Sequence, residues 1–449
     1  MVIVGIALCL ILSSFSLIAR SESNSSGFTL PCVINTFGNA WDGLLAFDLE
    51  GNASYFVIAD SNGTVLSLRE SPGTNGYGPA YDIAANTLLF EGEPNEDEPN
   101  SAWPVWATHV WNLSSNTFED FLNVLSEHDI QYDPVDNTFL TLQDYVRQIG
   151  QNLILMDKVL QVDASGKILW SWDTYDHVPL SEVSPYNETA VVNGQTVEDF
   201  THANSLDWDY KDGIIYLNLR NTNTFYAINQ TTAEVIWACG EFGNFTLLGS
   251  DGQPVASLWY GSHDLKEVAP DVFTLFNNDY ANNTNFDDCR SSLMEITLNE
   301  TTMTAHVDFN WEAPIQYWNA YGGANVVLPN GDFLGDFGDP THQYTQNQPW
   351  DFNDSGAVFV EVNSADQLVR TFSFPVGWYV YRVEALTDVS PSISISPAPT
   401  STVPAVAASS TLLSTIAAVD VAIVIVVVLA IAKLRNSSKA TRTNSYELD

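Results

Sequence analysis

Positively charged residues are scarce in this chain. It contains 15 Lys and Arg against 55 Asp and Glu in 449 residues, which gives a formal net charge of −40 at pH 7. A charge of this size and sign repels polyanions at long range. The composition therefore argues against a nucleic-acid partner, and any arginine or histidine that recurs at one place in a repeat stands out.

The common signatures of nucleotide and metal chemistry are also missing. The sequence has no GxxxxGK[ST] phosphate loop, no CxxC pair and no Cys/His zinc spacing. We therefore expect no nucleotide donor, no cofactor and no metal. Cys9 lies in an N-terminal apolar run, so Cys32, Cys239 and Cys289 remain. One disulfide and one free thiol is the simplest expectation, with the pairing left open.

Long amphipathic helices are absent, and only 119–126 and 142–150 are candidates for short ones. Alternating Val, Ile, Phe, Tyr, Trp and Thr punctuated by Asn, Asp and Gly predict strands instead. One hairpin pattern recurs at Leu45–Ala59, Tyr81–Glu91, His128–Leu142, Asn204–Arg220, His263–Asp279 and Gly323–Gly338. Repeated sheets of this kind predict an all-β fold, a six-bladed β-propeller over residues 30–388. A large β-sandwich array is the alternative.

The two ends differ in composition from this region. Residues 1–20 are apolar and resemble a signal peptide, and residues 389–410 form an uncharged stalk rich in Ser, Thr and Pro. Residues 411–432 are apolar and long enough for one transmembrane helix, and 433–449 begin with basic residues typical of a cytoplasmic tail. With ten Asn-X-Ser/Thr sequons, this predicts a glycosylated single-pass type I membrane protein. Its ectodomain would be extracellular or in the secretory or vacuolar lumen.

The fourth hairpin carries the most specific chemistry. Its Asp-Gly turn is centred on Lys211, and positions 202 and 220 are equidistant from that centre. An antiparallel hairpin therefore places His202 beside Arg220 at its open end, with Asn204 close by. An imidazole, a guanidinium and a carboxamide together can bind an anion.

Three of the six hairpins begin with a histidine, namely His128, His202 and His263. The first strand of each propeller blade faces the central axis. The repeat therefore predicts that these three histidines and Arg220 meet at one end of that axis.

These motifs, taken together, resemble those of a known family. Thr201-His202-Ala203-Asn204 with Arg220, the step His128-Asp129-Ile130, and His263-Asp264 ahead of Leu275-Phe276-Asn277-Asn278 are similar to motifs of the arylsulfotransferases that use no nucleotide donor. The chain would be a divergent, membrane-anchored member. The resemblance implies a six-bladed propeller that moves a sulfuryl group from an aryl sulfate ester to a phenol.

The resemblance also implies roles for single residues. His263 would be the catalytic nucleophile that forms a sulfo-histidine, and Arg220 would hold the sulfate oxygens. His128 and His202 would be catalytic donors or proton carriers, and Asn204 would bind substrate. The alternative is a non-catalytic, glycosylated cell-surface propeller for ligand binding or adhesion. The sequence leaves the oligomeric state open.

Overall fold

The computed structural model describes residues 29–386 except 52, 72–79, 83–85, 96–100, 103–104, 183–187, 281–287 and 339–355. The predicted signal peptide, stalk, transmembrane helix and tail lie outside these residues. Within the described ranges, none of the helices has the length and apolar character needed to cross a bilayer.

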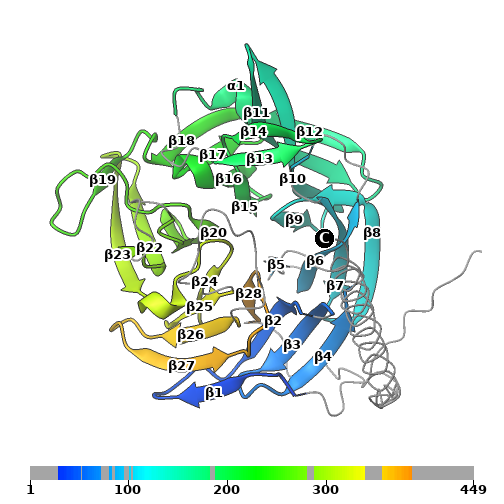
Figure 1. The fold of residues 1–449 in the computed structure, drawn as a ribbon, viewed down its shortest axis with the longest axis vertical. Helices are drawn as coiled ribbons and strands as arrows, with labels where there is room; N and C mark the ends of the chain where they lie inside the picture. Colours follow the sequence, from blue (N-terminus) through cyan, green and yellow to red (C-terminus); the bar gives the residue numbers. More distant parts are fainter. Residues whose placement is uncertain are drawn as a thin grey trace, which may run out of the picture. The chain divides into compact units, whose positions relative to one another are not determined.

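The described strands form six mainly antiparallel sheets arranged around one axis (Figure 1). The prediction of a six-bladed, all-β propeller is therefore confirmed. Blade one consists of β28 (Val383–Leu386), β2 (Leu44–Leu49), β3 (Tyr55–Asp60) and β4 (Val65–Glu70). Blade two consists of β5 (Ala80–Asp82), β6 (Thr87–Asn95), β7 (Val105–Asn112) and β8 (Thr117–Ser126).

Blades three and four begin next to His128 and His202, respectively. Blade three has β9 (Ile130–Asp133), β10 (Thr138–Ile149), β11 (Asn152–Asp163) and β12 (Ile168–Asp173), with β13 (Thr189–Val192) and β14 (Gln195–Asp199) added beside β11. The short helix α1 (Thr174–His177) follows β12. Blade four has β15 (Ala203–Asp209), β16 (Ile214–Leu219), β17 (Thr224–Asn229) and β18 (Glu234–Gly240), with the 3₁₀ turn η1 (Arg220–Thr222) after β16.

Blades five and six complete the ring. Blade five has β20 (His263–Ala269), β21 (Val272–Asn277), β22 (Ser292–Asn299), β23 (Thr304–Glu312) and the outer strand β19 (Thr246–Leu248). The 3₁₀ turn η3 (Ile315–Tyr317) leads to blade six, which has β24 (Ala324–Val327), β25 (Phe333–Phe337), β26 (Val358–Val362), β27 (Leu368–Ser373) and β1 (Val33–Thr36). The first strands β28, β5, β9, β15, β20 and β24 contact one another in this order around the axis.

Both ends of the described chain take part in closing the ring. The N-terminal β1 pairs with β27 of the last blade, and the C-terminal β28 pairs with β2 of the first, with Ala385 opposite Leu45. The predicted hairpin Leu45–Ala59 therefore supplies the second and third strands of blade one, whereas its five counterparts supply first and second strands. The axial strand of blade one comes from the opposite end of the sequence.

Apolar side chains between neighbouring blades form the core. Leu140 and Trp172 of blade three pack in one buried cluster with Leu217 and Ile228 of blade four. Each such side chain contributes about 1.5–3 kcal/mol when fully buried. The strand starts near the axis are thus held by packed sheets on both sides, which gives the residues there fixed positions.

Two smaller expectations were wrong. Residues 119–126 and 142–150 are not helical, because they lie in β8 and at the end of β10. β10 pairs with β11 along its whole length, from Thr138–Asp163 to Ile149–Asn152, and these long-range hydrogen bonds outweigh the local helix preference. The expected disulfide is also not formed, since no bridge joins Cys32, Cys239 and Cys289 in the described part of the chain.

Candidate functional site

His202 and Arg220 meet at the open end of the β15–β16 hairpin, as the sequence predicts. The backbone N–H of Arg220 donates to the carbonyl oxygen of His202 at 3.0 Å. The register runs from Asp209–Ile214 to Ala203–Leu219, and Asn204 is an extra residue that bulges out of the ladder. Bulges re-aim neighbouring side chains and are frequent beside functional sites.

Hydrogen bonds between the first strands show which positions are equivalent from blade to blade. Asp129 accepts the N–H of Leu206 at 2.8 Å, and Asp264 accepts that of Asn325 at 2.9 Å. Each of these aspartates follows a predicted site histidine directly. His128 and His263 therefore occupy matching positions in blades three and five.

The three imidazoles and the Arg220 guanidinium gather at this end of the axis. The rings of His128 and His202 have their centroids 5.1 Å apart, and the charges of His202, His263 and Arg220 all act on His128. His128 and His202 have φ values of +62° and +50°. Such backbone strain in a residue other than glycine persists where the surroundings hold it, often at functional sites.

His263 has a defined tautomer. Its Nδ1 lies 2.7 Å from Oδ1 of Asn278, and the amide nitrogen of Asn278 donates to the carbonyls of Asn319 and Gly322. The Asn278 oxygen therefore has to accept, so Nδ1 of His263 carries the proton and Nε2 keeps its lone pair. Burial, and then the charge of Arg220, hold the pKa of His263 well below its usual value. His263 is neutral with a nucleophilic nitrogen available.

The pKa values of the other two histidines, His202 and His128, are shifted in opposite directions. Burial lowers the pKa of His202, but the carboxylate of Asp199, whose Oδ2 is 2.6 Å from Nδ1, outweighs burial and raises that pKa above its usual value. Burial and the neighbouring charge of His202 hold the pKa of His128 well below its usual value. The cluster thus combines a proton donor (His202) with neutral imidazoles.

Arg220 is fully buried and held in one orientation. Its Nη1 lies 2.6 Å from Oε2 of Glu188. The rings of Tyr280 and Tyr321 flank the guanidinium carbon at 4.7 and 5.1 Å. Gly261 packs tightly against Tyr280, because a Cβ at Gly261 would lie 2.9 Å from Cβ of Tyr280, and its backbone has φ of +66°. A fixed guanidinium in a buried site binds sulfate-like oxygens well.

Asn204 has another set of contacts. Its amide nitrogen donates to the carbonyl of Ser262 at 2.8 Å, and its oxygen accepts from Asn218 at 2.7 Å. It is fully buried and ties blade four to blade five. Its role in substrate binding stays a prediction. Its hydrogen bond to the carbonyl of Ser262 holds the backbone next to His263.

Glu188, Asp199 and His202 offer ligand atoms within 4.8 Å of one another, a spacing that a metal ion could use. Their partners favour a different function. Glu188 pairs with Arg220, and Asp199 pairs with His202. Because these cations already balance the two carboxylates, a divalent ion would add repulsion with Arg220.

Sequence reasoning missed several residues around the cluster. Asn278 is the last residue of the motif Leu275-Phe276-Asn277-Asn278. Its role becomes clear only from the structure, where it fixes the tautomer of His263. Glu188 and Asp199 precede the motif of blade four, with no pattern that marks them. Tyr381, whose ring centroid lies 6.3 Å from that of His263 in an edge-on contact, and Arg382 directly precede the closing strand β28. The sequence signal for these two residues is the strand-like run 379–386. Its position beside the site follows only from the pairing of β28 with β2, which closes the ring.

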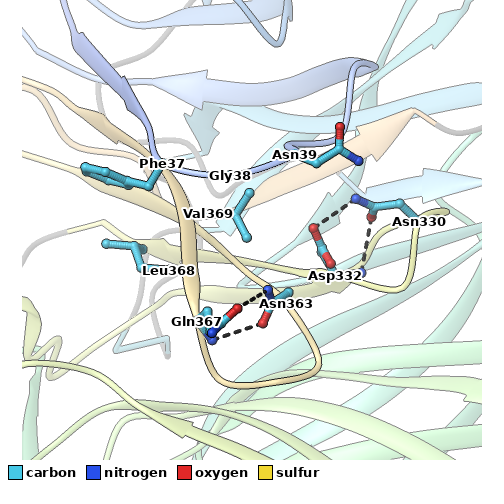
Figure 2. Close-up of a pocket in the computed structure, with 9 residues that line it drawn as sticks. All are labelled: Phe37, Gly38, Asn39, Asn330, Asp332, Asn363, Gln367, Leu368 and Val369. Carbon is cyan, nitrogen blue, oxygen red and sulfur yellow. Dashed lines mark hydrogen bonds between the residues drawn. The ribbon is translucent and has the colours of Figure 1, made fainter.

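A pocket of about 530 Å³ lies elsewhere in the molecule, in blade six. Figure 2 shows polar groups of Asn39, Asn330 and Asp332 gathered on one side of Val369. Its residues include the turns that join β24 to β25 and β26 to β27. Because β24 begins beside Tyr381, these turns lie at the end of the blade opposite the histidines.

Comparison with known proteins decides the family. The arylsulfotransferase (ASST) family model matches residues 113–377. The chain belongs to the arylsulfotransferase family. The match covers blades three to five completely, and all five predicted site residues fall within it. No curated protein matches the chain significantly.

Among solved structures, the chain is similar to a protein of unknown function from Bacteroides caccae, with 9% identity, coverage of 76% of this chain and 98% of the other, and a TM-score of 0.40. It is also similar to a putative 6-phosphogluconolactonase from Bacteroides fragilis, with 11% identity, coverage of 77% and 98%, and a TM-score of 0.38.

Proposed function

We propose that this protein transfers a sulfuryl group from an aryl sulfate ester to a phenol through a sulfo-histidine on His263. The observation that carries the proposal is the hydrogen bond from Nδ1 of His263 to Asn278. It leaves the lone pair on Nε2 of a neutral imidazole, next to the charges of Arg220 and His202. A nucleophile, an anion-binding cation and a proton donor therefore lie together.

In the first half-reaction, Nε2 of His263 attacks sulfur, and the bond from sulfur to the aryl oxygen breaks. Arg220 balances charge on the sulfuryl oxygens, and the His202 imidazolium gives its Nε2 proton to the leaving phenolate. In the second half, neutral His202 takes the proton of an acceptor phenol, whose oxygen attacks sulfur and displaces His263. The ring centroid of His128 lies 5.1 Å from that of His202. In this mechanism, neutral His128 donates a hydrogen bond to the sulfuryl group.

The test uses the purified full-length chain with 4-nitrophenyl sulfate and phenol, without nucleotide. We expect release of 4-nitrophenol, phenyl sulfate as product, and a sulfated peptide that contains His263. The variant His263→Ala should lose transfer, whereas His306→Ala, on the exposed surface of β23, should keep it. Transfer that persists in His263→Ala would reject the nucleophile, and transfer without an adduct would reject the two-step route.

We also propose that the catalytic part faces the outside of the cell or the lumen of the secretory or vacuolar pathway. The apolar segments 1–20 and 411–432 and the sequons support this arrangement. Expression in eukaryotic cells should give a membrane-bound chain whose mobility shifts after glycosidase treatment. A chain that fractionates without membranes and shows no shift contradicts the proposal.

The pocket of Figure 2 favours a second candidate function, ligand binding without catalysis. None of the residues that line it in the described part of the chain is cationic, and carboxamides dominate. Phe37, with 65% of its surface exposed, offers a ring at its edge. This chemistry suits a neutral saccharide. Binding of oligosaccharides that Asn330→Ala abolishes, in a chain that lacks transfer activity, would support this candidate over the enzyme.

A further inference from the structure

Arg382 reaches the site from the segment just before β28, the strand that closes the ring. It directly precedes β28, and only 1% of its surface is exposed. Its Nη1 lies 2.9 Å from Oδ1 of Asp129, and its Nε lies 3.3 Å from Oδ1 of Asp264. One guanidinium therefore links blade one to blades three and five.

The two partners of Arg382 directly follow the site histidines His128 and His263. The other carboxylate oxygen of each aspartate holds the backbone of the next blade, at Leu206 and Asn325. Each aspartate is thus fixed on two sides. A shift of the guanidinium would move the backbone steps on which both imidazoles stand.

Arg382 also contributes charge where the chain has little of it. Lys266 is the other cation near Asp264, and it also pairs with Glu384. The charge of Arg382 acts on both His128 and His263, where it opposes protonation. No protein group in the described part of the chain accepts a hydrogen bond from its buried Nη2 or Nε. The guanidinium therefore contacts Asp264 as an ion pair, and Nη1 is the group that lies at hydrogen-bond distance from Asp129.

We propose that Arg382 is a positioning residue, delivered by the closing strand, that holds the steps His128-Asp129 and His263-Asp264 at the separation needed for sulfuryl transfer. This rests on the proposed function. Among the described ion pairs, those of Arg382 alone join both Asp129 and Asp264, since Lys266 pairs with Asp264 but not with Asp129. The site is complete only when the C-terminal strand has docked on blade one.

Positioning predicts a specific kinetic signature. A misplacement of about 1 Å at a reacting group can lower a rate by about 100-fold. For Arg382→Gln in the full-length chain we expect a fall of this size in kcat for 4-nitrophenyl sulfate, with a smaller change in KM. Arg382→Lys keeps the charge but lacks the fork that spans both aspartates, so it should recover only part of the rate.

The matched control is Arg370→Gln. Arg370 is also buried, and its Nη2 lies 2.7 Å from Glu361, but it belongs to β27, away from the histidines. It should lower the melting temperature while kcat stays within about twofold, since no reacting group moves. If Arg382→Gln fails to fold, the double variant Arg382→Gln with Asp129→Asn is used in its place. The second substitution restores the net charge of the buried cluster.

A second readout is independent of activity. In NMR titrations, the midpoints of His128 and His263 should move to higher pH in Arg382→Gln and stay unchanged in Arg370→Gln. If the wild-type chain transfers no sulfate, the proposed function fails, and the titration still tests the position of Arg382. A folded Arg382 variant with kcat within threefold of wild type, or with unmoved histidine midpoints, overturns the proposal.

Discussion

Asp199 and His202 form a buried ion pair, with Oδ2 of the carboxylate 2.6 Å from Nδ1 of the imidazole. The pair places Nε2–H of His202 on the side away from Asp199. A raised pKa keeps that group protonated to higher pH. In the proposed mechanism, the ion pair therefore distinguishes the proton donor His202 from the nucleophile His263.

Replacing Asp199 by Asn should move the alkaline limit of activity to lower pH. Burial then acts on His202 without the opposing carboxylate, so its pKa falls. The pH dependence of kcat/KM measures this limit. The stability that the pair contributes is present below the usual pKa of histidine and is lost as pH rises through the raised one. Asp199→Asn should therefore lose more stability at pH 5 than at pH 8, and an unchanged profile would contradict the role.

Asn278 should control the acidic limit. In Asn278→Asp a carboxylate faces Nδ1 of His263 and favours the imidazolium, so the nucleophile is lost at higher pH than in the wild type. We expect the acidic limb of kcat/KM to move upward. In Asn278→Ala the tautomer is no longer fixed, and kcat should fall by roughly 10-fold or more. Equal activity of all three proteins across pH 4–8 would show that the tautomer is irrelevant.

The fork of Arg220 should matter more than its charge. Arg220→Lys keeps one cation but loses the planar donors that Glu188, Tyr280 and Tyr321 hold in place. We expect kcat/KM to fall by about 10²–10³, as for the loss of one preorganised donor. Arg147→Lys, on β10, is the control and should leave kcat/KM unchanged. A fall of less than threefold in Arg220→Lys would mean that a point charge suffices.

Asn218 should be important for stability. Its amide nitrogen donates to Oδ1 of Asn204 and to the carbonyl of Ser262, and all three are fully buried. Asn218→Ala leaves these acceptors short of a partner, which costs about 1–3 kcal/mol of unfolding free energy. Denaturant unfolding measures the loss. Gln367→Ala, at an exposed turn, should cost less than about 0.5 kcal/mol, and equal losses would contradict the assignment.

The propeller should be most stable in mild acid. Burial raises the pKa of Asp157 to about 7, of Asp207 to about 6 and of Glu384 to about 7. Between about pH 4 and 7 the folded state thus binds more protons than the unfolded chain, so stability falls as pH rises through this window. Calorimetry should show a higher melting temperature at pH 5 than at pH 8. The opposite order would mean that these carboxyls are ionised in the fold.

The sequence predicts the propeller well because the hairpin pattern is local. Each hairpin places its own turn and its own first histidine, so His202 and Arg220 can be paired by counting from Lys211. The same locality explains the failures. The windows 119–126 and 142–150 resemble helices until β7 and β11 are known to lie beside them.

The rest of the site depends on contacts between distant parts of the chain. Arg382 is more than 100 residues from Asp264 in sequence, and nothing near either residue indicates that they meet. Asp199 and Asn278 lie near the motifs, but their effect on charge and tautomer follows from side-chain geometry. The sequence pattern therefore predicts the histidines and the arginine of the candidate site, but not the residues that hold them in position.

The direction of β28 sets where the chain leaves the propeller. Arg382 lies with the histidines, and the strand runs from Val383 to Leu386 toward the other end of the axis, about 13 Å for four residues. The last described residue is therefore at the end of the ring farthest from His263. The described chain therefore ends on the side of the propeller opposite the cluster of His128, His202 and His263.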